Sequence, residues 1–481
     1  MALAFTRPTF GLLAALAFAP LLFALEGART PGQAAGLGFL AGAIANGLCC
    51  VWLVGTISIF GGFPLLLALP IYAALVAWTA IPFAAFGALV SWAGVNPPVL
   101  LAPLLWTAIE AFFPNLFPWR LGYTQRALPV LIQSAEWVGP TLLTFTLVWL
   151  GTATARLKRR PLGILPPLAL LALLAVHGRW RIAEIDQEIS RAPRLQIGVV
   201  QGNIGLDEKR HVDLFESNID RYRKLSLALT PTPDLLIWPE TVVEWGLPHG
   251  ATSLSAGLDP FPDAPAPLLF GALTFQPGAT QSRWYNSILL RDAGGRIVGD
   301  YDKIVLMPFG EFLPFADAFP WLRSLSPMTG DFVRGTEMRP LRLNDKARLG
   351  VVVCYEDMLP DLFADASAQG ANLLASLTND AWYGDSSALQ LHETLAFFRA
   401  VENRRFLVRS TNTGLTSVID PVGRVQATLP PWQATASSIE VALLDLPTPY
   451  RAFDRPVRIL LLVSAAALLL WCRSTSRRQR G

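Results

Sequence analysis

Hydrophobic residues run almost without interruption through the first 180 residues, where only short polar hinges divide them. A helix needs about 20 apolar residues to cross the hydrocarbon core of a bilayer. Further apolar stretches follow the first one at once, so we interpret it as a membrane helix rather than a signal peptide. The predicted spans are residues 9–26, 34–55, 64–92, 99–113, 129–152 and 162–177, with a seventh at 457–472.

The pattern changes between residues 190 and 450, where charged residues return and short strand-like runs alternate with helical ones. This alternation is typical of one compact α/β domain. The expected strands are Leu195–Gln201, Asp234–Trp238, Leu268–Thr274, Leu349–Cys354, Asn372–Leu377 and Val408–Asn412. The chain therefore divides into membrane helices at 1–180, the α/β domain at 190–450, a last membrane helix at 456–473 and a basic tail at 474–481.

Of the 481 residues, 52% are hydrophobic and 16% are charged, whereas soluble proteins average about 25% charged residues. This composition indicates an integral membrane protein with a soluble part. The net charge of +3 is small, and basic residues gather beside apolar segments, which favours a role in topology over nucleic-acid binding. The two clusters are Arg156, Lys158, Arg159, Arg160 and Arg473, Arg477, Arg478, Arg480.

Lys and Arg favour the cytoplasmic side of short loops. Both basic clusters lie in the cytoplasm only if residues 180–455 lie on the opposite face of the membrane. In a bacterium that face is the periplasm. Counting back through the predicted spans places the N-terminus outside the cytoplasm as well.

Cys354 is the one cysteine within the α/β domain, because Cys49, Cys50 and Cys472 lie in apolar segments. It ends the hydrophobic run that begins at Leu349, so it is expected at the carboxyl edge of a buried strand, where α/β folds place reactive groups. With no partner in that domain it does not belong to an intramolecular disulfide. A lone cysteine there is either a packing residue or a nucleophile.

Two more residues at predicted strand ends, Glu240 and Lys303, suit a nucleophilic Cys354, and Glu311 follows Lys303 in the next segment. A thiol with a pKa of about 8.5 needs a base, and Glu240 is placed to take its proton. Lys303 would stabilise the thiolate and an oxyanion, the Tyr355 N–H group would be a second donor, and Glu311 would hold Lys303. Each alone also reads as an ordinary turn or surface residue. Their combination favours catalysis.

The segments IWPE, YDK, PFGE and CYE occur in this order and resemble the Glu–Lys–Cys triad of the nitrilase (carbon–nitrogen hydrolase) superfamily. The flanking membrane spans and several further motifs make the chain similar to the apolipoprotein N-acyltransferase family. Those motifs are VVQGNI at 199–204, SLTNDAWYG at 376–384, RAVENRRFLVRSTNTGLTSVIDPVG at 399–423, IFGGFP at 59–64 and FPWRLGYTQ at 117–125.

The resemblance implies an α-β-β-α sandwich fused to membrane helices in the bacterial inner membrane. It implies that a fatty acyl chain passes from a membrane phospholipid, expected to be phosphatidylethanolamine, through a thioester on Cys354. The acceptor would be the α-amino group of a diacylated N-terminal cysteine on a lipoprotein. No cofactor, metal or nucleic acid is implied, and a monomer is expected. The four His residues, at 177, 211, 249 and 392, also lack metal-ligand spacing.

Two features depart from the family pattern. The family has eight spans and a cytoplasmic N-terminus, whereas seven spans are predicted here, so an element is expected to be missing at the front. Members often carry a Trp after the VQGNI-like strand, where this chain has Glu208, Lys209 and Arg210. An aromatic contact from that loop is therefore not expected.

Further candidates follow from lipid substrates. Trp382 and Tyr383, in the loop that begins at Asn379, would form a mobile lid over lipid or anchor the protein to headgroups. Glu110 is an intramembrane carboxylate and a functional candidate, unless it lies at the outer end of its span. Glu356 would help to shape the pocket and support Lys303.

The chief alternative is a membrane-anchored amidase of the nitrilase type, in which water attacks the thioester. Such an enzyme needs one anchor and not seven spans. A non-catalytic scaffold would have lost a triad residue, and none is lost. A transporter would leave the large outer domain unexplained.

Overall fold

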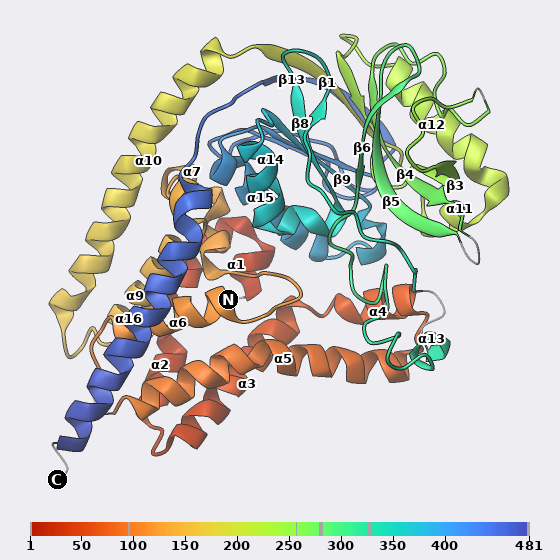
Figure 1. Cartoon of the computed structure of the whole chain (residues 1–481). Helices are drawn as coiled ribbons and strands as arrows, with labels where there is room; N and C mark the ends of the chain where they lie inside the picture. The colour runs from red at the N-terminus through yellow and green to blue at the C-terminus, as the bar shows by residue number, and fades with distance from the viewer. Residues whose placement is uncertain (1, 95–96, 256, 279–281, 326–328, 479–481) are drawn as a thin grey trace.

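The computed structural model describes residues 2–94, 97–255, 257–278, 282–325 and 329–478. Figure 1 shows a bundle of helices from both ends of the chain, with a layered α/β domain beside it. The helical part consists of α1 (Ala2–Thr6), η1 (Pro8–Leu16), α2 (Ala19–Glu26), α3 (Pro31–Cys49), α4 (Leu53–Gly61), α5 (Leu65–Trp92), α6 (Leu101–Phe112), η2 (Leu121–Ala127), α7 (Pro129–Ile132), α8 (Ala135–Val138), α9 (Thr141–Ala155), η3 (Pro161–Ile164), α10 (Leu165–Arg191) and α16 (Tyr450–Arg478).

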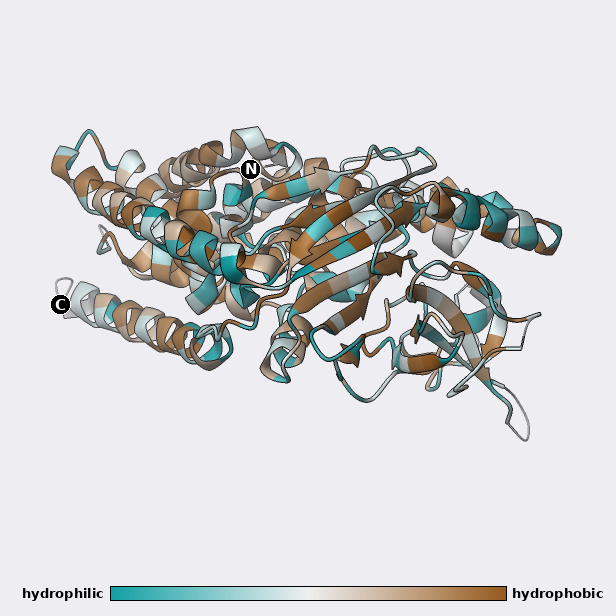
Figure 2. Ribbon diagram, turned by 90° about the horizontal axis from the view of Figure 1, so that it is seen from above, coloured by the Kyte–Doolittle hydropathy of each residue, from teal (hydrophilic) through white to brown (hydrophobic). Residues whose placement is uncertain are grey.

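Within the described residues, four helices are long and apolar enough to cross a membrane, and a pair bent by 60° makes a fifth candidate. In Figure 2 hydrophobic residues cover much of α16 and of the other long helices. The predicted spans 99–113 and 129–152 hold only the shorter apolar helices α6 and α9, so the count of seven crossings stays a prediction. The candidates are Thr9–Glu26, Leu65–Trp92, Pro161–Arg191, Tyr450–Ser476 and the bent pair Pro31–Cys49 with Leu53–Ile59.

The two basic clusters contact the same end of the helical part. Arg156 donates a hydrogen bond to the carbonyl of Pro97 at 2.8 Å. Arg473 donates to the carbonyl of Trp92 at 3.4 Å and stacks on the Trp92 ring. Figure 1 places the C-terminal end of α16 far from the α/β domain. Arg156 and Arg473, one residue from each cluster, therefore lie on one side, opposite the α/β domain.

The α/β domain contains two mixed sheets that lie face to face. The first has the order β13-β1-β2-β4-β5-β6, with β3 added beside β4, and the second has the order β12-β11-β10-β9-β8-β7. The strands are β1 (Arg194–Gln201), β2 (Leu235–Ile237), β3 (Val243–Pro248), β4 (Leu268–Gln276), β5 (Arg283–Arg291), β6 (Ile297–Asp302), β7 (Leu341–Arg342), β8 (Arg348–Val353), β9 (Leu373–Thr378), β10 (Leu407–Thr411), β11 (Ser417–Ile419), β12 (Val425–Thr428) and β13 (Thr435–Ala442).

Helices cover the outer faces of both sheets. The α12 helix packs on β1, and α14 and α15 pack on β8 and β10, which confirms the expected α-β-β-α sandwich. All six predicted strands are present within a residue or two of their expected bounds. The helical elements are α11 (Leu206–Arg210), η4 (Val212–Leu214), α12 (Phe215–Leu227), α13 (Leu322–Leu325), η5 (Cys354–Met358), α14 (Pro360–Ala368), η6 (Asp380–Tyr383) and α15 (Ala388–Asn403).

Strands β8, β9 and β10 run parallel and form the centre of the second sheet. Their residues are almost all buried, which explains the unbroken hydrophobic runs of the sequence. Because parallel strands end at the same edge, the segments that follow β8 and β9 emerge side by side. These segments are the turns η5 and η6.

The α15 helix joins the α/β domain to the helical part. It packs on β10 on one side and contacts α1, η2 and α8 on the other (Figure 1). Every residue of α15 except Gln390 is buried, although the helix carries several charged side chains. Charges buried in this way need partners, and the helical part supplies some of them: Arg126 pairs with Glu393, and the Tyr123 hydroxyl accepts from Arg399.

Arg404, directly after α15, makes the most heavily bonded of these contacts. Its backbone is left-handed, with φ 52°. Its guanidinium pairs with Glu136 at 2.8 Å and donates to the Gln133 side chain at 2.6 Å, and both partners lie in the helical part. Arg181 pairs with the second oxygen of Glu136 at 2.9 Å. Glu136 therefore ties α10 and the α/β domain to one point.

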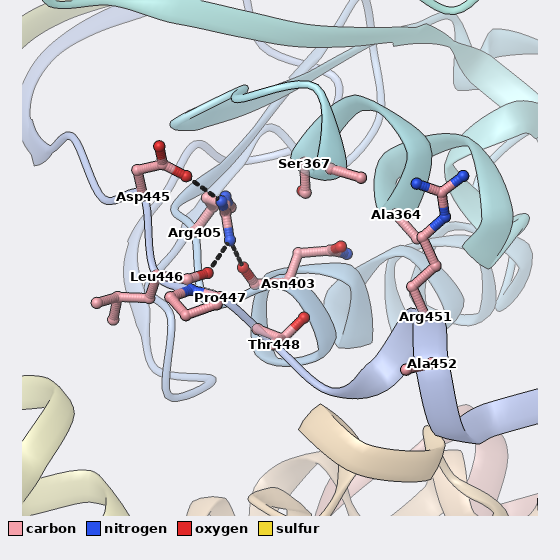
Figure 3. A pocket seen from close by; sticks show the side chains of 11 residues that line it. Ala364, Ser367, Asn403, Arg405, Asp445, Leu446, Pro447, Thr448, Arg451 and Ala452 are labelled. Atoms are coloured by element: carbon pink, nitrogen blue, oxygen red, sulfur yellow. Dashed lines mark hydrogen bonds and ion pairs between the residues drawn. The ribbon is translucent and has the colours of Figure 1, made fainter.

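Two further ion pairs fix the ends of the α/β domain. The predicted span 162–177 continues as a polar helix to Arg191, and Asp186 of this extension pairs with Arg424 at 2.8 Å. Arg405 pairs with Asp445 at 2.7 Å and donates to the carbonyl of Leu446, in the linker before α16 (Figure 3). Arg405, Asp445 and Leu446 line a cavity of about 550 Å³.

Replacing Glu136 with Gln removes the charge that Arg404 and Arg181 share and leaves a buried guanidinium without its counter-ion. We expect the free energy of unfolding of the detergent-solubilised protein to fall by about 3–5 kcal/mol. Denaturant titration followed by tryptophan fluorescence measures the change.

Asp365→Asn is the matched control. Asp365 pairs with Arg451 at 3.0 Å, but the two side chains are 44% and 61% exposed. Exposed pairs contribute less than about 1 kcal/mol. Equal losses in the two variants would contradict an anchoring role for Glu136.

Candidate active site

The facing sheets bring together three residues that the sequence predicts as catalytic. Glu240 follows β2 and Lys303 follows β6, both in the first sheet, whereas Cys354 follows β8 in the second. Glu240 and Lys303 are buried and Cys354 is half-buried. The charges of Glu240 and Lys303 both act on the Cys354 thiol. A base, a cation and a thiol therefore share one enclosed edge.

Lys303 lies between two carboxylates. Its Nζ is 2.8 Å from Glu311 Oε2 and 3.8 Å from Glu240 Oε1. Burial alone would lower the pKa of Lys303, but the charges of Glu311 and Glu240 outweigh it and raise the pKa above its usual value. Lys303 is therefore an ammonium at neutral pH. Glu311 is held in turn by the backbone N–H of Met307 at 2.8 Å.

Asn286 is a site residue that the sequence analysis missed. Its side-chain amide donates to Glu240 and to Glu311, each at 2.9 Å. It lies in β5 and is buried. In the sequence Asn286 stands beside Ser287 in a strand that also carries Arg283 and Arg291, so its amide alone did not mark it. Asn286 fixes the distance between the two carboxylates on either side of Lys303.

Cys354 has a strained backbone, with φ 51°. A non-glycine residue in this region is uncommon and is often found at functional sites. Burial, and next the charge of Glu240, raise the pKa of the Cys354 thiol well above its usual value, although Lys303 opposes them. Burial also raises the pKa of Glu240. The resting thiol therefore keeps its proton, and Glu240 is a stronger base than an exposed glutamate.

Glu356 joins the nucleophile to the lysine segment. Its carboxylate is fully buried, and burial raises its pKa to about 7 against the opposing charge of Lys303. Glu356 supports Lys303 by accepting hydrogen bonds from the backbone of the two residues that follow this lysine. The carboxylate accepts hydrogen bonds from the N–H groups of Ile304, Val305 and Val353, at 2.7–2.9 Å, and from the hydroxyl of Tyr301 at 2.9 Å.

An aromatic cluster connects this edge to the helical part. The Tyr355 hydroxyl donates to the carbonyl of Leu116 at 2.6 Å. Trp52 lies edge-to-face with Tyr383, with ring centroids 5.2 Å apart. We call Trp52, Phe117, Tyr355 and Tyr383 the aromatic collar. It lies between the Cys354 turn and the membrane helices.

The remaining predicted residues have structural partners. Asn379 is buried, and its side-chain oxygen accepts from Ala381 N at 3.3 Å and from Asn412 at 3.2 Å, so it shapes the start of η6. The carbonyl of Trp382 accepts from Thr56 of α4 at 3.3 Å. Their expected role in lipid binding stays a prediction.

Glu110 stabilises the segment that contains the FPWRLGYTQ motif. Its carboxylate accepts from the backbone N–H of Leu121 at 2.7 Å, from Thr144 at 2.8 Å and from Trp106 at 3.2 Å. These bonds fix the start of η2 against α6 and α9. In the part of the chain that the structure describes, no cluster of three or more His, Cys, Asp or Glu side chains suits a metal ion.

Sequence comparisons cover both parts of the chain. The carbon-nitrogen hydrolase profile matches residues 196–448, and the profile of the apolipoprotein N-acyltransferase N-terminal domain matches residues 1–153. Apolipoprotein N-acyltransferase of Geobacter metallireducens is 33% identical over 460 residues, which covers 92% of this chain and 87% of the relative. The Azotobacter vinelandii protein of that name is 34% identical and covers 78% of this chain and 73% of its own.

A solved carbon-nitrogen hydrolase from Helicobacter pylori aligns with 56% of this chain and 94% of its own, at 14% identity and a TM-score of 0.37. The family assignment rests on the sequence comparisons, which span the membrane helices and the α/β domain alike. The chain therefore belongs to the apolipoprotein N-acyltransferase family.

Proposed function

We propose that this protein transfers a fatty acyl chain from a membrane phospholipid to the α-amino group of a diacylglyceryl-cysteine at the N-terminus of a lipoprotein. The reaction is ping-pong, with a thioester on Cys354, and it completes lipoprotein maturation. The observation that carries the proposal is the convergence of Cys354, Glu240 and Lys303 on the sheet edge that the aromatic collar joins to the membrane helices.

In the first half-reaction Glu240 takes the proton of the Cys354 thiol, and the thiolate attacks the phospholipid ester carbonyl. The Lys303 ammonium and the Tyr355 N–H group stabilise the oxyanion of the tetrahedral intermediate. The C–O bond then breaks, and the lysophospholipid leaves with the proton from Glu240. An acyl chain remains on the sulfur.

In the second half-reaction the lipoprotein amine attacks the thioester carbonyl. Glu240 accepts a proton from the amine, the C–S bond breaks, and the thiol is restored as an amide forms. An amine opens a thioester more readily than an oxygen ester, so the intermediate makes transfer to nitrogen easier. Asn286 and Glu311 hold Glu240 and Lys303 in place through both steps.

Both substrates are lipids, and this accounts for the join between the two parts. Burying one methylene group is worth roughly 0.8 kcal/mol, so drawing a whole acyl chain through water would cost far more than any single contact recovers. The aromatic collar provides an apolar path from the bilayer to Cys354. Trp382 and Tyr383, in the turn that contacts α4, either form the lid over that path or anchor the domain at the lipid headgroups.

We place the protein in the bacterial inner membrane, with the α/β domain in the periplasm. The common position of both basic clusters supports this topology. The first span supports it too, because Glu26 at its end pairs with Arg159 at 3.1 Å, whereas α1 at its start packs on α15. We expect phosphatidylethanolamine as donor and a monomeric enzyme.

The alternative is a membrane-anchored amidase that hydrolyses the thioester. In that reaction the same three residues would act, and water would attack the thioester in place of the lipoprotein amine. The tie between the collar and the membrane helices favours a lipid donor over a small soluble amide.

Incubating the purified protein with phosphatidylethanolamine tests the intermediate. We expect a mass increase of one fatty acyl chain, released by hydroxylamine, because the Cys354 thiolate attacks the donor ester. Cys354→Ala is expected to gain none. Intact-protein mass spectrometry measures both.

Adding a diacylated lipopeptide then separates transferase from hydrolase. The transferase discharges the thioester onto the peptide amine and yields an amide, whereas an amidase releases free fatty acid at the same rate with or without the peptide. Wild-type protein that never gains the acyl group, or a Cys354→Ala variant that gains it equally, contradicts the proposed function.

Replacing Asn286 with Leu removes a hydrogen bond that stabilises ionised Glu240 and so raises the pKa of Glu240 further. Because the base acts in its ionised form, the acid limb of kcat/KM for Cys354 acylation moves to higher pH. We expect a shift of about one unit, since a hydrogen bond to a charged group is worth about 1.5–3 kcal/mol and one pKa unit about 1.4 kcal/mol.

Asn403→Leu is the matched control, because Asn403 is a buried amide that donates to Arg399 O at 2.9 Å at the C-terminal end of α15, beside the cavity of Figure 3. We expect it to lower stability without moving the acid limb. An unchanged limb in Asn286→Leu would mean that the amide does not act on Glu240.

A further inference from the structure

His392 of α15 lies between two carboxylates that the proposed mechanism does not use. Its Nε2 is 2.8 Å from Asp357 Oδ1, and its Nδ1 is 2.8 Å from Asp380 Oδ1. Arg409 completes the cluster, with Nε 2.9 Å from Asp357 Oδ2 and Nη2 3.7 Å from Asp380 Oδ2. All four side chains are buried. Two cations thus balance two anions.

The two carboxylates belong to the two turns at the active edge. Asp357 lies in η5, three residues after Cys354, and Asp380 begins η6, which carries Trp382 and Tyr383. The backbone at Gly414 packs so closely on Asp380 that an added Cβ would lie 2.2 Å from Oδ2. Asp380 therefore has little room to move away from His392. The imidazole bonds both carboxylates at 2.8 Å and so links the Cys354 turn to the Tyr383 turn, with Arg409 as a second, longer bridge.

The imidazole makes both bonds as a donor only when it is protonated. Burial alone would lower the pKa of His392, but the charges of Asp357 and Asp380 overcome it and raise this pKa to about 9. The pKa of Asp357 falls to about 2, because His392 and Arg409 outweigh burial. The link is thus ionised and complete at neutral pH.

The link positions the ring of Tyr383. Its ring lies edge-to-face with His392, with centroids 5.9 Å apart, and edge-to-face with Trp52 of the helical part at 5.2 Å. It also interacts electrostatically with Cys354. Tyr383 therefore stands between the thiol and the membrane helices, where a long acyl chain would pass.

We propose that His392 is a positioning residue that holds the Tyr383 turn at a fixed place beside Cys354 and thereby selects long-chain acyl donors. This inference rests on the proposed function, because it names a determinant of its acyl specificity. A short acyl group reaches the thiol without contacting Tyr383. A long chain must lie along it, so displacement of the turn affects long chains selectively.

The test compares two esters that acylate the same thiol in the full-length protein in detergent. The rates of p-nitrophenol release from p-nitrophenyl palmitate and p-nitrophenyl acetate are measured after subtracting those of Cys354→Ala. We expect His392→Gln to lower the palmitate-to-acetate ratio at least tenfold while the acetate rate changes less than threefold. His211→Gln, at an exposed histidine, should keep the wild-type ratio.

Asp380→Asn tests the same link with a smaller disturbance, and it decides the matter if His392→Gln does not fold. It keeps the side-chain volume and removes one charge, so we expect the ratio to fall at least threefold. An unchanged ratio in the folded variants overturns the proposal, and so does an equal loss with both esters, which indicates a merely structural role. Absence of any Cys354-dependent acylation in wild type instead contradicts the proposed function.

The pH dependence gives a second readout. Because the pKa of His392 in the folded protein is about 9, the imidazolium makes both bonds at neutral pH and loses its proton as pH rises through about 9. The groups facing His392 are Asp357, Asp380, Arg409 and Tyr383, and the pKa of Tyr383 is raised well above its usual value by burial. Ionisation of the Cys354 thiol changes both rates by the same factor, so it does not alter the palmitate-to-acetate ratio.

We therefore expect the wild-type ratio to fall as pH rises from 8 to 9.5. In Asp380→Asn the fall begins at lower pH, because one of the two carboxylates that raise the pKa of His392 is gone. A wild-type ratio that stays constant up to pH 9.5 would overturn the proposal.

Discussion

The carboxylate of Glu356 joins the two sheets at the place where the nucleophile emerges. It accepts the N–H group at the end of β8 and two N–H groups just after Lys303, at the end of β6. The strained turn at Cys354 and the lysine therefore share one rigid support. A buried group with this many donors is costly to move, because each unmade hydrogen bond leaves a desolvated polar atom. The positions of the thiol and the ammonium depend on this one side chain.

The side chains at this sheet edge are buried, and their neighbours set their protonation states. Lys303 stays charged because Glu311 and Glu240 surround it, while burial and the charge of Glu240 keep the Cys354 thiol protonated. The His392 cluster behind them is balanced in the same way, with two carboxylates facing an imidazolium and Arg409. The site thus holds strong fields in a small space with few mobile parts, which is how preorganised sites stabilise transition states.

Buried charges with partners also hold the α/β domain against the membrane helices. Almost every residue of α15 is buried, and ion pairs cross the interface at Glu393, which meets Arg126, and just after the helix at Arg404, which meets Glu136. Buried ion pairs are weak evidence for stability but specify geometry, because only one alignment pairs every charge. A fixed alignment keeps the aromatic collar continuous from Trp52 to Tyr355. A lipid substrate requires this continuity between bilayer and thiol.

The sequence alone determined the layout of this protein. Runs such as 349–354 predict buried strands because burial on both faces leaves no room for polar residues. Glu240, Lys303 and Cys354 were predicted as site residues because they stand at the ends of such strand-like segments. The motif resemblance added the sandwich and the family. The sequence did not identify Asn286, the hydrogen-bond donors to Glu356, the burial of α15 or the link through His392. Most of these contacts join groups far apart in the chain, such as Arg404 and Glu136, and no local periodicity records them. Only the packing of the two sheets on each other and on the membrane helices decides which buried charges meet.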